Sequence, residues 1–474
     1  MLEWFIGWIA SNAFLHRKFL EYFCAWEFVW QFEKEGSISI DDLKTEVFGK
    51  HWQDETWHEV LQLIAGMIDA KFVGEILDYL MVQDGEEKKF INLFLAAKCL
   101  AEVRNRLIIA PVANKLFGKV KDLTKYDLWY YYTYDNAKET KLVQEVRIRA
   151  VVTIATIWKD NRDALHCLKD RATIYNYNYQ YVQYAAIEAL ASNFKDDPDT
   201  HSFLKDLTTA DNKNYVRCAA IEGLARNFPD DPDTRSILKD RATADNEGYV
   251  RRAAIEVLVS NFKDDPDTHS ILKDCATADN EGYVRRAAIE VLASNFKDDP
   301  ETLSFLKELT TADNQWYVRR AAIEALASNF KDDPETLSFL KDHATADNQW
   351  NVRSAAIEAL ASNFPNHPDT RWILKDRATA DNQWNMRSAA IQALAKHFRY
   401  QPELFEIYYN CAVNDPFKRK RDYETNPRRV ALEIIIKQFP QHPQTLTLLR
   451  DKAENDPDQQ VQNFAQQKLA ELEK

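Results

Sequence analysis

The sequence predicts an all-α protein in which pairs of helices repeat along the chain as an alpha-solenoid. A phenylalanine, a proline and an arginine each recur with a step of 34 residues through at least six copies. Only 10 of the 474 residues are glycine, which disfavours folds with many tight turns. The repeated region also lacks the alternation of apolar and polar residues that is typical of strands. A repeat of this length indicates a solenoid, in which each unit buries its apolar face on its neighbours.

Three registers define the units. The phenylalanine register contains Phe194, Phe228, Phe262, Phe296, Phe330, Phe364 and Phe398. The proline register contains Pro198, Pro232, Pro266, Pro300, Pro334, Pro368 and Pro402. Weaker copies flank this region: Val146-Arg147 leads to Trp158, and Arg428 leads to Phe439 after a seven-residue insertion. We therefore predict about ten units between residue 146 and the C-terminus.

One unit, from Asp265 to Phe296, reads as two helices. Asp265 is expected to cap a helix that begins at Pro266. Asp279-Asn280 ends that helix, and either side chain is expected to cap the next one. The second helix is YVRRAAIEVLASNF, and its spacing predicts an apolar face of Val284, Ala287, Ala288, Val291, Leu292 and Phe296.

The pattern D-N before V-R-x-A-A-I-x-x-L, with Asp-Pro before the first helix, resembles HEAT repeats. In that family the Asp of the inter-helix turn and the Arg of the second helix form a ladder between units, so the resemblance implies a structural role for the matching residues. These are Asp211, Asp245, Asp279, Asp313, Asp347 and Asp381, with Arg217, Arg251, Arg285, Arg319, Arg353 and Arg387. Gln183 and Gln462 replace the arginine near the ends, as expected of atypical terminal repeats.

The first part of the chain has no repeat. Helices are predicted at about 14–35, 40–50, 53–70, 72–83 and 86–105, and the apolar segment 1–13 is expected to be buried. Residues 14–25, FLHRKFLEYFCA, and residues 51–68 resemble the end of the NACHT module of bacterial STAND-class NTPases. That family carries F-x-H-x-T/S-F-x-E-Y-F-x-A in its winged-helix segment, and the matching residues here are Phe14, His16, Phe19, Glu21, Tyr22, Phe23 and Ala25.

The resemblance implies three domains. Residues 1–35 correspond to a remnant of the NACHT winged-helix segment, residues 36–125 to the helical domain that follows NACHT, and residues 126–474 to a HEAT-repeat solenoid. No P-loop motif is present, since neither Gly49-Lys50 nor Gly118-Lys119 has the other residues of that motif. We therefore expect a truncated or split member of the family, with a P-loop NTPase domain on a separate chain as one alternative.

His16 is a nucleotide-binding residue by this resemblance alone. Without a P-loop domain, it is more simply explained as a helix-surface or interface residue. His51 and His58 share a helix face, but two histidines are too few for a zinc site. We therefore predict no metal, no cofactor and no catalytic residue, and the protein is expected not to be an enzyme unless a separate NTPase chain completes it.

The net charge and the cysteine content of the chain limit the kinds of partner and compartment that we expect. The net charge of −13 disfavours nucleic acid, and the basic run 417–429 is expected to be a solvated loop. The six cysteines lie far apart, which favours a reducing cytoplasm, and no membrane association is predicted. A protein partner is the remaining expectation.

A row of three tryptophans gives a candidate partner-binding surface. Trp316, Trp350 and Trp384 share one register, in which Gly248 and Gly282 stand earlier. Exposed aromatic rows often mark interfaces, although packing between units is an equally simple explanation. The predicted function is a non-catalytic sensor or scaffold arm of a NACHT-type signalling or defence protein. The alternative is a HEAT-repeat phycobilin lyase or a related modifying enzyme.

Overall fold

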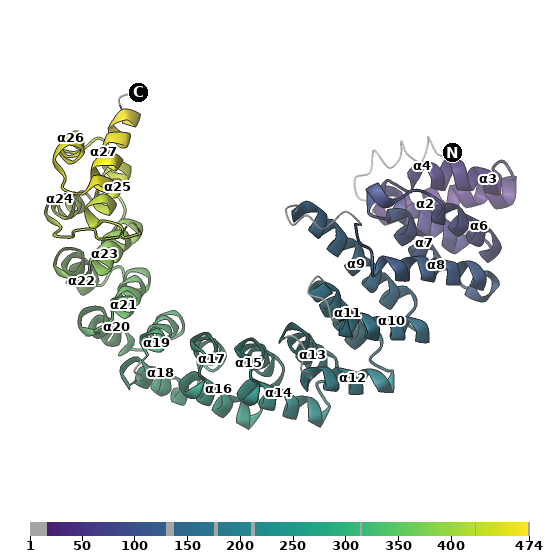
Figure 1. Cartoon of the computed structure of the whole chain (residues 1–474), viewed down its shortest axis with the longest axis horizontal. Coiled ribbons are helices and arrows are strands. Elements are labelled where there is room, and N and C mark those ends of the chain that lie inside the picture. The colour runs from purple at the N-terminus through teal and green to yellow at the C-terminus, as the bar shows by residue number, and fades with distance from the viewer. Residues whose placement is uncertain are drawn as a thin grey trace. The chain divides into compact units, whose positions relative to one another are not determined.

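The computed structural model describes residues 17–128, 137–174, 179–209, 214–312, 315–421 and 423–472, in which the regular structure consists of helices alone (Figure 1). The predicted all-α solenoid is thus confirmed. The chain divides into two compact units, Met1–Ile237 and Leu238–Lys474. The predicted domain boundaries near residues 35 and 125 fall inside the first unit and stay predictions. Within the described ranges, every helix falls short of the length and apolar character that a membrane span requires.

The first unit begins with a layer of helices, of which only the last belongs to a repeat. They are α2 (Arg17–Trp30) with a π-helical extension (Gln31–Glu35), α3 (Ile40–Asp42), α4 (Gly49–His51), α5 (His58–Met67), α6 (Ala70–Met81), α7 (Ile91–Glu102) and α8 (Ala110–Leu123). The extension ends at Gly36, whose φ of 65° favours a residue without Cβ. Helix α7 is the centre of this layer, because α5, α6 and α8 all pack against it and most of its side chains are buried.

The repeats of the first unit follow directly. They comprise α9 (Ala137–Ile157), α10 (Arg162–Thr173), α11 (Gln180–Asn193), α12 (Pro198–Thr209) and α13 (Asn214–Asn227). Helix α9 carries the Val146-Arg147 pair and packs against both α8 and α11. In the structure, α8 therefore serves as the first helix of the earliest predicted repeat.

The second unit contains the most regular repeats. Helix α14 (Pro232–Ala244) spans the division. The following helices are α15 (Gly248–Phe262), α16 (Pro266–Ala278), α17 (Gly282–Asn295), α18 (Pro300–Ala312), α19 (Trp316–Asn329), α20 (Thr336–Ala346), α21 (Trp350–Asn363), α22 (Pro368–Ala380), α23 (Trp384–His397), α24 (Phe405–Asn414), α25 (Pro427–Gln438), α26 (Thr445–Asn455) and α27 (Gln459–Leu472).

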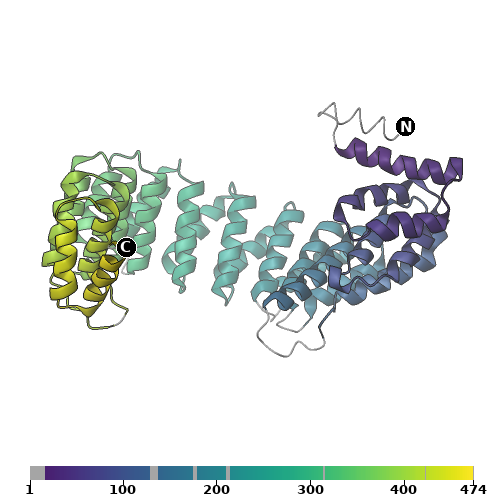
Figure 2. The same ribbon diagram turned by 90° about the horizontal axis from the view of Figure 1, so that it is seen from above.

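Within this unit the helices form two layers. The odd-numbered helices from α15 pack on one another and form the inner, concave layer of the unit, and the even-numbered helices form the outer layer (Figure 1). Figure 2 shows the same helices from above, along their length. Side chains on the open face of α19, α21 and α23 therefore share one surface.

The caps of one unit are largely as predicted. The side chain of Asp265 accepts a hydrogen bond from the Asp267 amide at 2.9 Å, and α16 begins at Pro266. The prediction for the second helix was wrong in one detail, since Glu281 is the N-cap of α17. The Asp279 carboxylate instead accepts from the Glu281 amide at 2.8 Å and so closes the turn between the helices.

The buried face of α17 is wider than predicted. Val291 and Phe296 are only half-buried, whereas Ile289 and Ala293, which lie outside the predicted stripe, are completely buried. A single amphipathic stripe suits a helix that packs against one side only. Helix α17 contacts α15, α16, α18 and α19, so its neighbours cover a broader sector than a single stripe.

Candidate partner-binding surface

Arg251 connects two consecutive turns. Its Nε and Nη2 atoms donate to the two carboxylate oxygens of Asp279 in the next unit, at 2.6 and 2.7 Å. Its Nη1 atom donates to the main-chain carbonyl of Asp245, in its own unit, at 2.7 Å. The hydrogen bonds that Arg251 donates to Asp279 raise the pKa of Arg251, and both side chains are almost completely buried. This arrangement satisfies the polar groups of both turns while they are shielded from water.

The same paired geometry recurs along the second unit. It joins Arg319 to Asp347, Arg353 to Asp381, Arg387 to Asp415 and Arg428 to Asp456, with each distance between 2.6 and 3.0 Å. Burial alone raises the pKa of Asp347, but hydrogen bonds from Arg319 and Gln349 outweigh it and hold that pKa below its ordinary value. The arginines and aspartates of this series thus bind one another between consecutive units and stabilise the stacking of those units.

Four predicted members belong to pairs that the described contacts cover only in part. Asp211 and Asp313 lie outside the described residues. Arg217 is buried, and Arg285 donates from Nε to the carbonyl of Ala276 at 2.9 Å. Gln183 stands in the arginine register and accepts from the Tyr215 hydroxyl at 2.6 Å.

The sequence interpretation missed three members, which are Asp415, Arg428 and Asp456. Asp415 continues the 34-residue step from Asp381, and Arg428 was already aligned with a later unit, but neither was assigned to the series. The separation of 28 residues between each arginine and its aspartate would have found all three.

A hollow lies on the inner layer and is here called the inner groove. It has a volume of about 610 Å³. Its walls comprise Arg320, Glu324, Ala327 and Ser328 of α19, Ser354, Ala355, Glu358, Ala359, Ser362 and Asn363 of α21, and Ala389, Gln392, Ala393 and Lys396 of α23. The groove thus has a floor of small side chains between charged edges.

A substitution within the repeat explains the position of the groove. Arg252, Arg286 and Arg320 occupy one register of the inner helices, and each forms an ion pair with the glutamate four residues later, at 2.7–2.8 Å. Ser354 stands in that register on α21, so the long side chain and its ion pair are missing there. The shorter residue leaves room above Ala355 and Ala359.

The charges at the groove edge are fixed in place. Glu358 accepts hydrogen bonds from Lys396, and from the imidazole of His397 at 2.9 Å. Burial raises the pKa of Glu358, but these two partners more than compensate and lower it overall. On the opposite edge, Arg320 and Glu324 also line a smaller hollow that contains Trp316. Trp316 therefore lies at one end of the same surface.

The three tryptophans are not equivalent. The side chain of Trp316 is 37% exposed, whereas Trp350 and Trp384 are half-buried. Trp350 packs against the core of the unit, and the ring of Trp384 lies 5.0 Å from that of Phe417. Neither of these two residues lines the inner groove.

Packing explains the change from glycine to tryptophan in this register. A Cβ atom on Gly282 would meet the ring of Tyr317 at 2.8 Å, and one on Gly248 would meet the Tyr283 hydroxyl at 2.2 Å. In the next units, tryptophan replaces glycine, and asparagine replaces the tyrosine 35 residues later, giving the pairs Trp316/Asn351 and Trp350/Asn385. The large side chain of the pair thus moves from one unit to its neighbour, because glycine faces tyrosine in the earlier units and tryptophan is matched with the smaller asparagine in the later ones.

The remaining candidates lie elsewhere. His16 lies outside the described residues. The His58 ring bonds to the carbonyl of Trp52 at 2.8 Å, while His51 stacks on Trp57, so each histidine has a local partner. In the basic run, Arg419 forms an ion pair with Asp458 at 3.4 Å.

The comparisons with known proteins agree with this architecture. Residues 141–225, 174–259, 204–293, 269–361 and 303–395 match the family model for HEAT repeats. Among solved structures, the chain is similar to Kap121p (13% identity, 91% of this chain and 55% of that chain, TM-score 0.47). It is also similar to Kap95p with RanGDP (14%, 91% and 63%, 0.46) and to importin beta (13%, 85% and 60%, 0.39). The chain thus spans little more than half of the length of these structures, and no curated protein matches it in sequence.

The matched segments together cover more than half of the sequence, from residue 141 to residue 395. They contain the helix pairs from α9 to α22 and the connections of Arg251 to Asp279, Arg319 to Asp347 and Arg353 to Asp381. The chain belongs to the HEAT repeat family.

Proposed function

We propose that the chain is a non-catalytic scaffold or sensor arm that binds a protein partner along the inner groove and Trp316. The observation that carries this proposal is the groove itself, which lies where serine replaces the arginine of the preceding units, at Ser354 on α21 and at Ser388 on α23. The repeats extend that layer over several units, and such surfaces suit extended partners.

Three features of the groove favour a protein partner. Its floor of alanine and serine admits side chains of another molecule, and its edges offer both signs of charge for polar contacts. Trp316 adds an exposed aromatic anchor of the kind that dominates binding energy at interfaces. The net charge of −13 opposes nucleic acid as the alternative.

We further propose that this arm belongs to a signalling or defence system, and the NACHT-like residues at the N-terminus support this setting. The resemblance covers the segment around Phe19 and Tyr22, which lies in α2. We propose that a separate chain supplies the P-loop domain. A neighbouring reading frame with a Walker A motif, and co-purification of its product, would support this setting, whereas an unrelated gene neighbourhood would leave the groove proposal standing alone.

Photo-crosslinking tests the partner-binding proposal. A photoreactive amino acid is placed at Ser328 or Ser362 in the groove, or at exposed Ser338 on the outer helix α20 as the control. Irradiation in the cells that make the protein should give one and the same crosslinked protein from both groove positions and none from position 338. Crosslinks of equal yield from the outer position, or none from the groove, would refute the proposal.

A further inference from the structure

Lysines on the outer layer form a second regular series between units. In the usual arrangement, one ammonium group binds both acidic side chains at the start of the next outer helix. The examples are Lys205 with Asp231 and Asp233 (3.4 and 2.7 Å), Lys239 with Asp265 and Asp267 (2.9 and 2.7 Å), and Lys307 with Asp333 and Glu335 (2.9 and 2.6 Å). The ammonium group thus occupies the space where the two carboxylates converge.

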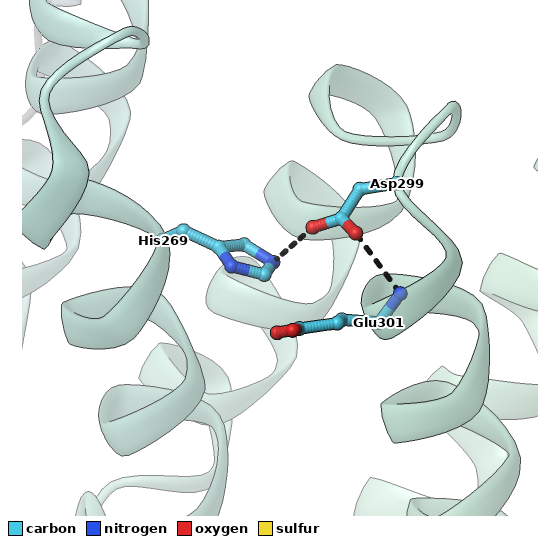
Figure 3. A group of neighbouring side chains, drawn as sticks. All are labelled: His269, Asp299 and Glu301. Carbon is cyan, nitrogen blue, oxygen red and sulfur yellow. Dashed lines mark hydrogen bonds and ion pairs between the residues drawn. The ribbon is translucent and has the colours of Figure 1, made fainter.

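The unit that contains His269 departs from this arrangement. Lys273 reaches Glu301 at 3.2 Å, and no ion pair joins it to Asp299 among the described contacts. The Oδ2 atom of Asp299 lies 3.4 Å from Nε2 of His269 instead. Figure 3 shows the imidazole pointing from α16 toward the carboxylates at the start of α18. An imidazole nitrogen and two carboxylates therefore meet across two consecutive units.

The local structure orients these groups. The Oδ1 atom of Asp299 accepts a hydrogen bond from the Glu301 amide at 2.9 Å, which leaves Oδ2 turned toward the imidazole (Figure 3). The ring of His269 lies 5.0 Å from that of Phe296, which limits its rotation. Burial, reinforced by the charge of Lys273, lowers the pKa of His269.

The spacing suits a tetrahedral metal ion. Ligand atoms at 2.0–2.1 Å from zinc lie about 3.3 Å from one another. The distance of 3.4 Å between His269 and Asp299 already meets this requirement. One potential ligand atom from each of His269, Asp299 and Glu301 lies within 4.8 Å of the others. The Glu301 side chain is 75% exposed and closes the remaining gap by rotation.

We propose that His269, Asp299 and Glu301 bind a divalent zinc-class cation, with water in the fourth position. Binding releases Glu301 from Lys273, an exposed pair of little energetic weight. It also replaces the 2.9 Å contact between His269 Nε2 and the Thr302 hydroxyl. The equivalent Thr268 donates to a main-chain carbonyl at the end of the preceding helix, so this register offers the hydroxyl another acceptor. The bound ion would link α16 to α18.

Calorimetry with Zn²⁺ on the full, EDTA-treated chain tests the site, with excess Mg²⁺ present. The expected result is one Zn²⁺ per chain in the wild type, loss of that binding in His269→Leu, and at least about tenfold weaker binding in Glu301→Gln. Leucine already occupies the register of His269 at Leu303 and Leu337, so the variant is expected to fold. Zn²⁺ should also raise the melting temperature of the wild type and leave that of His269→Leu unchanged.

His201→Leu is the matched control, because His201 lies beside Asp231 at 2.9 Å but Lys205 binds both nearby carboxylates. This variant should keep the wild-type stoichiometry and affinity. Zn²⁺ binding that is equally strong in His269→Leu, or no binding by the wild type, would overturn the proposal. Equal losses in the two histidine variants would also overturn it, since they would show that the two sites do not differ.

Discussion

Arg251 donates two parallel hydrogen bonds to the carboxylate of Asp279, a residue 28 positions later in the chain and one unit further along the solenoid. The neighbouring Arg252 forms only an exposed ion pair with Glu256, on its own helix. The two adjacent arginines thus have different roles. Arg251 joins two consecutive units, and Arg252 lies exposed on the inner layer.

Arg251→Ala is expected to lower the free energy of unfolding by about 3–5 kcal/mol, because it leaves the Asp279 carboxylate buried without its partner. Arg252→Ala, the matched control, is expected to cost about 0.5 kcal/mol or less. Urea denaturation measures both values. Equal effects of the two substitutions would contradict the structural role of Arg251.

The alternation between glycine and tryptophan predicts a coupled pair of substitutions. Gly282→Trp should destabilise the second unit by about 1–3 kcal/mol, because the new side chain collides with Tyr317. Adding Tyr317→Asn should recover most of this loss, since Trp316/Asn351 is the natural version of the same pair. A double-mutant cycle measures the coupling. If the two effects simply add, the packing explanation fails.

Trp316 and Trp384 are expected to differ in role, with one binding the partner and the other stabilising the fold. Trp316→Ala is expected to weaken partner binding with little change in melting temperature, because the side chain is 37% exposed at the groove end. Trp384→Ala should lower the melting temperature, because the indole packs near Phe417. Thermal denaturation beside crosslinking yield distinguishes the two. A large stability loss in Trp316→Ala would assign that residue to packing as well.

Stability should fall as the solution is acidified from about pH 7 to pH 5, and His343 is one cause. Burial lowers its pKa in the folded chain below that of the unfolded chain. The unfolded state therefore binds the proton first, and stability present at neutral pH is lost as the pH drops through the unfolded value. His343→Leu should flatten this part of the pH profile of the urea midpoint. An unchanged slope would show that other groups determine it.

The regular spacing made most of the fold predictable. A step of 34 residues with helical periodicity defines the helix pairs, and Asp265 before Pro266 marks where one helix begins. The buried position of Ile289 was missed because it depends on a third neighbouring helix, which a single amphipathic stripe does not reveal.

The groove and the His269 cluster were harder to predict for a different reason. Both depend on which residues of neighbouring units come into contact, and these lie about 28 to 39 positions apart in the sequence. Ser354 in an arginine register is visible in the sequence, but its effect on the surface follows only from the stacking of α19, α21 and α23. The pairing of Gly282 with Tyr317 likewise depends on the contact between consecutive units, which the sequence alone does not show.

The affinity of the crosslinked partner for the Ser354→Arg variant shows whether the inner groove binds that partner. This substitution introduces the residue that the repeat already has at Arg252, Arg286 and Arg320. The arginine side chain should therefore fill the groove and leave the melting temperature unchanged. We expect at least about tenfold weaker binding in titration calorimetry, while Ser338→Arg on the outer layer binds as the wild type does. Wild-type affinity in the Ser354→Arg variant would contradict the assignment of the inner groove as the partner-binding surface.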